Sequence, residues 1–114
     1  MALNKSEIFE QNDIKIALIC KALSHPARVK ILKILTELNV CMCGDIVNLI
    51  PLSQSTVSQH LKELKNAGLI KGAIDGPKVC YCADKQKIQD SFQIINEFQN
   101  QLIDSQGGCK NGKC

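Results

Sequence analysis

The apolar positions of the chain recur mainly at helical spacing, which predicts several helices. Residues 6–23 are mostly apolar with interspersed charges and contain no Gly or Pro, so we expect a helix without a sharp amphipathic face. Pro26 suits a first helical turn, and Ile31, Leu35 and Leu38 follow it at the spacing of one helix face. A second helix is therefore predicted to begin at Pro26.

The middle of the chain predicts two further helices with a short connection between them. Residues 44–50 are expected to form a short helix that Pro51 ends. Ser53 can cap the next helix, over residues 54–67, because its hydroxyl can accept a hydrogen bond from a free backbone NH. Gly68 can end that helix in a left-handed conformation. One face of this helix is apolar, and the other is rich in hydrogen-bonding groups.

The following segments predict a β-hairpin and a closing helix. Residues 69–74 and 78–83 are short extended segments joined by the turn sequence Asp75-Gly76-Pro77. Apolar residues recur at spacings of three and four over residues 85–105, which predicts a long amphipathic helix. The fold class is therefore mainly α with a small β-hairpin.

This order of elements is the layout of a winged helix-turn-helix. In such a domain the second helix enters the DNA major groove and the hairpin lies against the neighbouring backbone. Polar residues on a helix are often only its solvated face, but here the order of elements favours contact with DNA. The candidate DNA-binding residues are Gln54, Ser55, Thr56, Ser58, Gln59, His60, Lys62, Lys65, Lys71 and Lys78. Gln59 can pair with adenine through its amide, and His60 is expected to extend toward phosphates.

Composition limits the class of protein. The 114 residues are 45% hydrophobic and 22% charged with a net charge of +3, which suits one folded domain over residues 1–105. Residues 106–114 are expected to be a flexible, cysteine-containing tail. No apolar run is long enough for a membrane helix and no signal peptide is evident, so we expect a cytoplasmic protein without a membrane partner. The chain lacks Cys-x-x-Cys and a glycine-rich phosphate loop, so neither an enzyme nor an organic cofactor is expected.

The cysteines are organised in close pairs. Six of the seven form the pairs Cys41 with Cys43, Cys80 with Cys82, and Cys109 with Cys114. In a reducing compartment this pattern favours metal binding or thiol chemistry over structural disulfides, and thiolates favour thiophilic ions. Cys20 lies in an apolar stretch and is expected in the core. Cys80 and Cys82 share one face of their strand, where they could chelate together or simply pack.

Three stretches, 21–35, 52–64 and 67–70, closely resemble the ArsR/SmtB-type metalloregulatory repressors. The resemblance extends over about residues 20–100. It implies a homodimer built from the first and last helices that binds a palindromic operator and releases it when an inducer binds. It also identifies Cys41 and Cys43 as two thiolate ligands at the start of the helix before the recognition helix.

The sequence departs from the family pattern at the remaining ligands. Ile46 stands where the commonest arsenic sensors have a third cysteine, and no cysteine precedes Cys20 as in the cadmium type. The third thiolate is expected from Cys109 and Cys114 in the tail, with Cys80 and Cys82 as the other source. Arsenite or antimonite is the favoured inducer, with Cd or Zn possible. The alternative function is a thiol-redox repressor that is switched by disulfide or persulfide formation.

Overall fold

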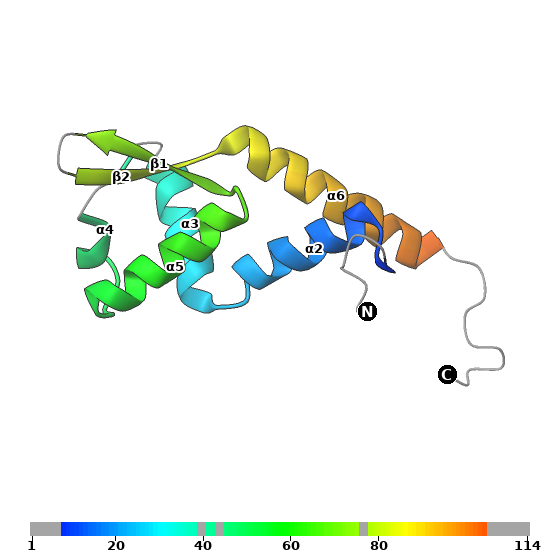
Figure 1. Ribbon diagram of the computed structural model, residues 1–114, viewed down its shortest axis with the longest axis horizontal. Helices are drawn as coiled ribbons and strands as arrows, with labels where there is room; N and C mark the ends of the chain where they lie inside the picture. The colour runs from blue at the N-terminus through cyan, green and yellow to red at the C-terminus, as the bar shows by residue number, and fades with distance from the viewer. Residues whose placement is uncertain (1–7, 39–40, 43–44, 76–77, 105–114) are drawn as a thin grey trace.

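The computed structural model describes residues 8–38, 41–42, 45–75 and 78–104. The elements of this part of the chain are α2 (Gln11–Ala22), α3 (Pro26–Leu38), α4 (Asp45–Asn48), α5 (Gln54–Asn66), β1 (Ile70–Asp75), β2 (Lys78–Ala83) and α6 (Lys85–Asp104). Figure 1 shows the hairpin and α3–α5 at one end of the molecule, while α2 and α6 run side by side away from them. The architecture is a winged helix-turn-helix, as the sequence predicts.

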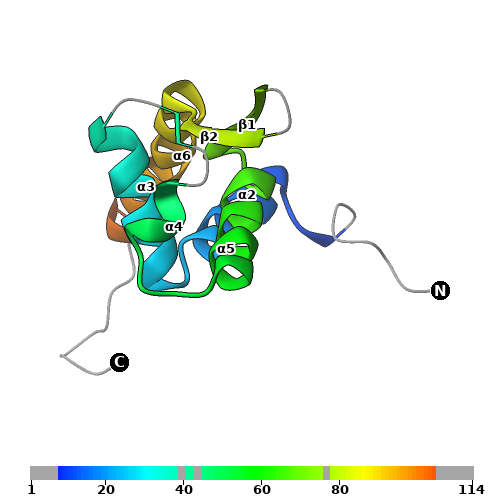
Figure 2. The same cartoon turned by 90° about the vertical axis from the view of Figure 1, so that its left-hand side faces the viewer.

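The core lies where α3, α4 and α5 meet the hairpin (Figure 2). Ile31 and Leu35 of α3 pack with Leu64 of α5, and all three side chains are almost completely buried. The amphipathic spacing of both helices supplies these residues, so each helix turns its apolar face inward. This packing fixes α5 against the domain while its opposite face remains at the surface.

Both ends of α5 form as the sequence predicts. The Ser53 hydroxyl accepts a hydrogen bond from the backbone N of Thr56 at 3.3 Å, which caps the first turn. Gly68 has a φ of 81°, which is favourable only for glycine, and the backbone N of Leu69 donates to the carbonyl of Leu64 at 3.1 Å. The chain therefore leaves α5 in a sharp turn that leads directly into β1.

The hairpin pairs antiparallel, from Ile70 opposite Ala83 to Asp75 opposite Lys78. The segment between α3 and α4 extends it on the β2 side. The backbone N of Met42 donates to the Tyr81 carbonyl at 2.9 Å, and the N of Tyr81 donates back to the Met42 carbonyl at 2.7 Å. The linker before α4 is thereby attached to the wing through backbone hydrogen bonds.

Two expectations about the first predicted helix need correction. Among the described residues α2 begins only at Gln11, because Glu10 occupies the N-cap and its backbone N donates to the Asp13 carboxylate at 3.3 Å. Cys20 is exposed, so its predicted place in the core is wrong. The buried positions of α2 are Ile19 and Ala22, and Cys20 lies between them on the outer side of the helix.

Helix α6 ends at Asp104, close to the predicted boundary, and the tail 106–114 lies outside the described residues. In the part of the chain that the structure describes, no helix is long and apolar enough to cross a membrane.

Candidate functional site

The outer face of α5 presents a continuous set of polar side chains. The exposed candidates on this helix are Gln54, Ser55, Thr56, Ser58, Gln59, Lys62 and Lys65. They are available because Val57, Leu61 and Leu64 occupy the inner face. This arrangement can offer amides, hydroxyls and ammonium groups together to the edges of bases and to phosphates.

Local hydrogen bonds hold part of this surface in place. The Thr56 hydroxyl lies 2.8 Å from the Ser53 hydroxyl, so the start of α5 carries a small hydroxyl cluster. The Gln59 amide donates to the Glu63 carboxylate at 3.4 Å. Both interactions are at the surface, where they exchange readily with water or with another partner. Gln59 is therefore oriented along the helix surface without being locked there.

Basic residues connect α5 with the wing. Lys71 of β1 is exposed, and Lys78 begins β2, although its side chain lies outside the described residues. The Lys65 side chain reaches across to β1, since a Cβ added at Gly72 would lie only 3.3 Å from its Nζ. Positive charge is thus placed where the helix and the hairpin meet, which suits a phosphate backbone following that junction.

The structure does not support the predicted role of His60 at phosphates, because this side chain is only 6% exposed. Arg28 Nε donates to His60 Nδ1 at 3.0 Å, and the His25 ring lies 4.4 Å away between centroids. His60 Nε2 is buried without a hydrogen-bond partner. Burial lowers the pKa of His60, and the charges of His25 and Arg28 lower it further.

His60 and Arg28 form a structural connection that sequence reasoning missed. Arg28 also donates from Nη1 to the Lys21 carbonyl at 2.9 Å, so one guanidinium joins the end of α2 to the buried side of α5. The sequence spacing of His60 nevertheless indicates its burial. His60 follows Val57 by three positions and precedes Leu64 by four, which places it on the apolar stripe of the helix.

The cysteine arrangement brings the linker and the wing together. Cys41 and Cys82 form a disulfide with a Cα–Cα distance of 4.3 Å across 41 positions of sequence. Cys41 is exposed and Cys82 is half-buried. Cys80, on the same strand, is only 6% exposed and is also in a disulfide. Both wing cysteines therefore form disulfides, whereas the sequence left chelation and simple packing open for them.

The other predicted thiolates, those of Cys43, Cys109 and Cys114, lie outside the described residues. Within the residues that are described, no three His, Cys, Asp or Glu side chains are grouped so that they could hold a metal ion. In the reduced state Cys41 and Cys82 would be two neighbouring thiols. Such a pair can donate to a thiophilic ion or be oxidised to a disulfide.

Comparisons with known proteins place this geometry in a family. Residues 25–71 match the bacterial regulatory protein, arsR family. A cadmium resistance transcriptional regulatory protein CadC homolog of Staphylococcus aureus is 39% identical over 93 residues, which cover 77% of this chain and 76% of that protein. An arsenical resistance operon repressor of Staphylococcus xylosus is 30% identical over 105 residues, covering 88% of this chain and 96% of that protein.

The fold agrees with these sequence matches. The structure of an ArsR-like transcriptional regulator from Rhodococcus sp. RHA1 superposes with a TM-score of 0.64 at 22% identity, covering 79% of this chain and 84% of that one. The match to the family extends from the turn before α3 to β1, and so includes α5 and its cap. The chain belongs to the arsR family of bacterial transcriptional regulators.

Proposed function

We propose that this regulator is a repressor that binds operator DNA through α5 and the wing and releases it when cysteine thiolates capture a thiophilic ion. Arsenite or antimonite is the favoured inducer, and Cd or Zn are the other candidates. Cys41 and Cys43 supply two thiolates, and Cys109 and Cys114 of the tail supply the rest. The repressor acts in the cytoplasm as a non-enzymatic protein.

The place of Cys41 is the observation that supports this proposal. Cys41 lies in the linker that leads through α4 into α5, and Met42 beside it is hydrogen-bonded to the wing. A ligand that pulls on this linker therefore acts on both DNA-contacting elements. The cadmium and arsenical resistance relatives agree with a thiophilic inducer.

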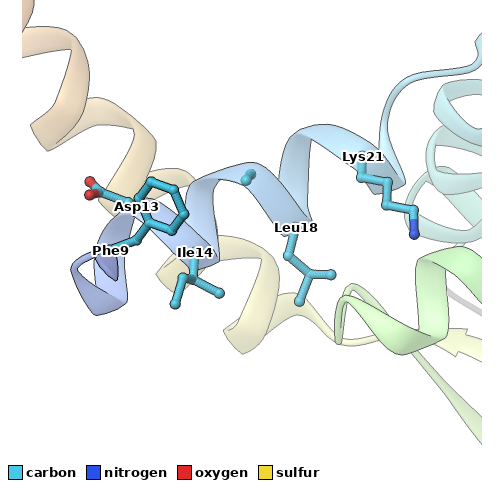
Figure 3. A pocket seen from close by; sticks show the side chains of 6 residues that line it. Phe9, Asp13, Ile14, Leu18 and Lys21 are labelled. Carbon is cyan, nitrogen blue, oxygen red and sulfur yellow. The ribbon is translucent and has the colours of Figure 1, made fainter. Parts of the chain in front are cut away.

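We further propose a homodimer built from α2 and α6. None of the α6 residues, all of which are described, is buried, although Phe92 and Phe98 lie on its apolar stripe. A groove that runs along α2 from Phe9 to Lys21 is lined by Ile14 and Leu18, whose side chains Figure 3 shows on one side of the helix. A second copy would cover these apolar side chains and place two α5 helices on successive half-sites.

The test is a titration of the fully reduced protein on labelled promoter DNA with arsenite, antimonite, Cd or Zn. We expect release by at least one of these ions. Cys43→Ser should abolish this response while leaving operator binding unchanged, because Cys43 is outside α5. Cys20→Ser is the matched control and should respond like the wild type. Truncation after Gln106 should weaken the response if the tail supplies ligands.

A second candidate function is a repressor that releases its operator when its thiols are oxidised. The Cys41–Cys82 disulfide favours it, since the two sulfurs already lie within bonding reach. The same titration separates the two functions. Release that occurs only with an oxidant, and never with an ion under strong reductant, would contradict the metal-responsive function.

A further inference from the structure

The Cys41–Cys82 disulfide uses a cysteine that the proposed function assigns to the inducer. Cys41 is the ligand candidate in the linker, and Cys82 belongs to β2 of the wing. Thiolates bind thiophilic ions, whereas a sulfur in a disulfide has no thiolate to donate. The inducer and Cys82 therefore compete for the sulfur atom of Cys41.

We propose that Cys82 is a redox gate for the inducer site: formation of the Cys41–Cys82 disulfide makes the repressor unresponsive to thiophilic ions while it stays on its operator. The inference rests on the proposed function, because it requires Cys41 to be an inducer ligand. It differs from the redox alternative, in which oxidation itself releases the operator. Here oxidation blocks release.

The backbone is already arranged for this bond. Met42 and Tyr81 exchange two hydrogen bonds at 2.9 and 2.7 Å, which places the neighbouring Cys41 opposite Cys82. In an antiparallel pair, directly opposite residues have their side chains on one face and close together. The disulfide therefore joins residues that backbone pairing has already brought together.

The DNA-contacting helix is not involved in the bond. Helix α5 contains no cysteine, and its buried face packs on α3 and β1. Its polar side chains are exposed in the structure that contains the disulfide. The oxidised protein is therefore expected to keep its recognition surface and its affinity for the operator.

The oxidation balances with a peroxide as the two-electron oxidant. The thiolate of Cys41, which is the more exposed of the two, attacks one peroxide oxygen. The O–O bond breaks, a sulfenic acid forms, and hydroxide leaves and takes up a proton. The Cys82 sulfur then attacks the sulfenic sulfur, the S–S bond forms, the S–O bond breaks, and water leaves with the thiol proton. Two thiols and one hydrogen peroxide give one disulfide and two waters.

The first experiment compares reduced and peroxide-treated full-length protein after the peroxide has been removed. Peptide mapping by mass spectrometry should find a Cys41–Cys82 cross-link only in the treated sample. Treated protein should bind promoter DNA within about twofold of the reduced protein. It should need at least tenfold more arsenite for release, and dithiothreitol should restore the original midpoint. Absence of the cross-link, or release of the operator by peroxide alone, would overturn the gate.

The second experiment tests whether Cys82 is responsible. The readout is the ratio of the arsenite midpoints of treated and reduced protein. All proteins compared carry Cys80→Ser, because Cys80 also forms a disulfide. In that background Cys82→Ser should bring this ratio close to one, whereas the exposed control Cys20→Ser should keep the ratio of the parent protein. An unchanged ratio in Cys82→Ser would overturn the gate. So would loss of the arsenite response in reduced Cys82→Ser, which would make Cys82 a ligand.

Failure of the gate and failure of the proposed function give different results. If none of arsenite, antimonite, Cd and Zn releases the reduced wild-type protein from its operator, the proposed function is overturned. The redox gate is then overturned as well, even where the cross-link forms. If the reduced protein responds and the cross-linked protein responds equally well, only the gate is overturned.

Discussion

Helices α5 and α6 have similar amphipathic patterns and very different surroundings. Helix α5 buries Val57, Leu61 and Leu64 against the rest of its own chain. Helix α6 buries none of its residues, all of which are described, and leaves Phe98 39% and Ile103 68% exposed. An amphipathic pattern therefore shows that a helix has an apolar partner, but it does not show whether that partner lies in the same chain.

The difference has a functional meaning in the proposed dimer. A helix that completes its core within one chain presents a fixed outer face, which suits recognition of DNA. A helix whose apolar face is open needs a second copy to cover it, which suits assembly.

The largest effect is expected from Leu64→Ala in α5. Leu64 is completely buried in the core. Removal of a buried leucine side chain costs about 2–5 kcal/mol of the free energy of unfolding. Urea denaturation should show this loss equally at low and high protein concentration. A loss that disappears at high protein concentration would mean that α5 also depends on the second copy.

A change in α6 should act on assembly. Burial of one large apolar side chain contributes about 1.5–3 kcal/mol, so Phe98→Ala should raise the dimer dissociation constant roughly ten- to a hundredfold. Sedimentation velocity over a range of concentrations measures this constant. Gln93→Ala on the same helix is the control and should leave it unchanged. An unaltered dissociation constant for Phe98→Ala would place the dimer interface elsewhere.

The outer face of α5 should affect DNA binding without affecting folding. Gln59→Ala is expected to weaken specific operator binding by about 1–3 kcal/mol if the amide makes a bidentate base contact. Its free energy of unfolding should change little, because the side chain is exposed. Fluorescence anisotropy on operator and on unrelated DNA measures the effect. Equal losses on both DNAs would contradict base recognition.

The smallest effect is expected from His60 on the buried face of α5, as a pH dependence of stability. The pKa of His60 is lowered in the folded protein, so the unfolded chain binds more protons below its ordinary pKa of about 6.5. The stability tied to neutral His60 is therefore complete above that pH and is lost as the pH falls toward the lowered pKa. His60→Gln should reduce the loss in unfolding free energy between pH 7.5 and 5.5, as measured by urea denaturation. A pH dependence identical to that of the wild type would assign it to groups other than His60.

The sequence predicted best those features that depend on interactions between residues close together in the chain. Pro26 begins α3, Ser53 caps α5 and Gly68 ends the turn after it, because each depends on backbone geometry over a few residues. The outer face of α5 followed from the same periodicity. These features include the whole exposed set of candidate DNA contacts on that helix.

The features that sequence reasoning missed depend on contacts between distant segments. His60 was interpreted by its residue type, but Arg28 provides it with a buried partner. Cys20 stands in an apolar stretch, yet α2 turns it outward. The pairing of Cys41 with Cys82 follows from the backbone bridge between the linker and the wing, which no local pattern indicates.

The bridge between Met42 and Tyr81 also determines whether the linker can separate from the wing without unfolding of the whole domain. The hairpin itself forms between sequence neighbours, whereas its attachment to the linker closes a long loop that contains α4 and α5. Closing such a loop costs entropy, and two backbone hydrogen bonds, the packing of Met42 against the core and the Cys41–Cys82 disulfide oppose that cost. Once the Cys41–Cys82 disulfide is reduced, detachment of the linker from the wing is a sub-global opening that leaves the buried residues of α3 and α5 packed together. A small molecule acting there works against this local free energy and not against the free energy of unfolding the whole domain.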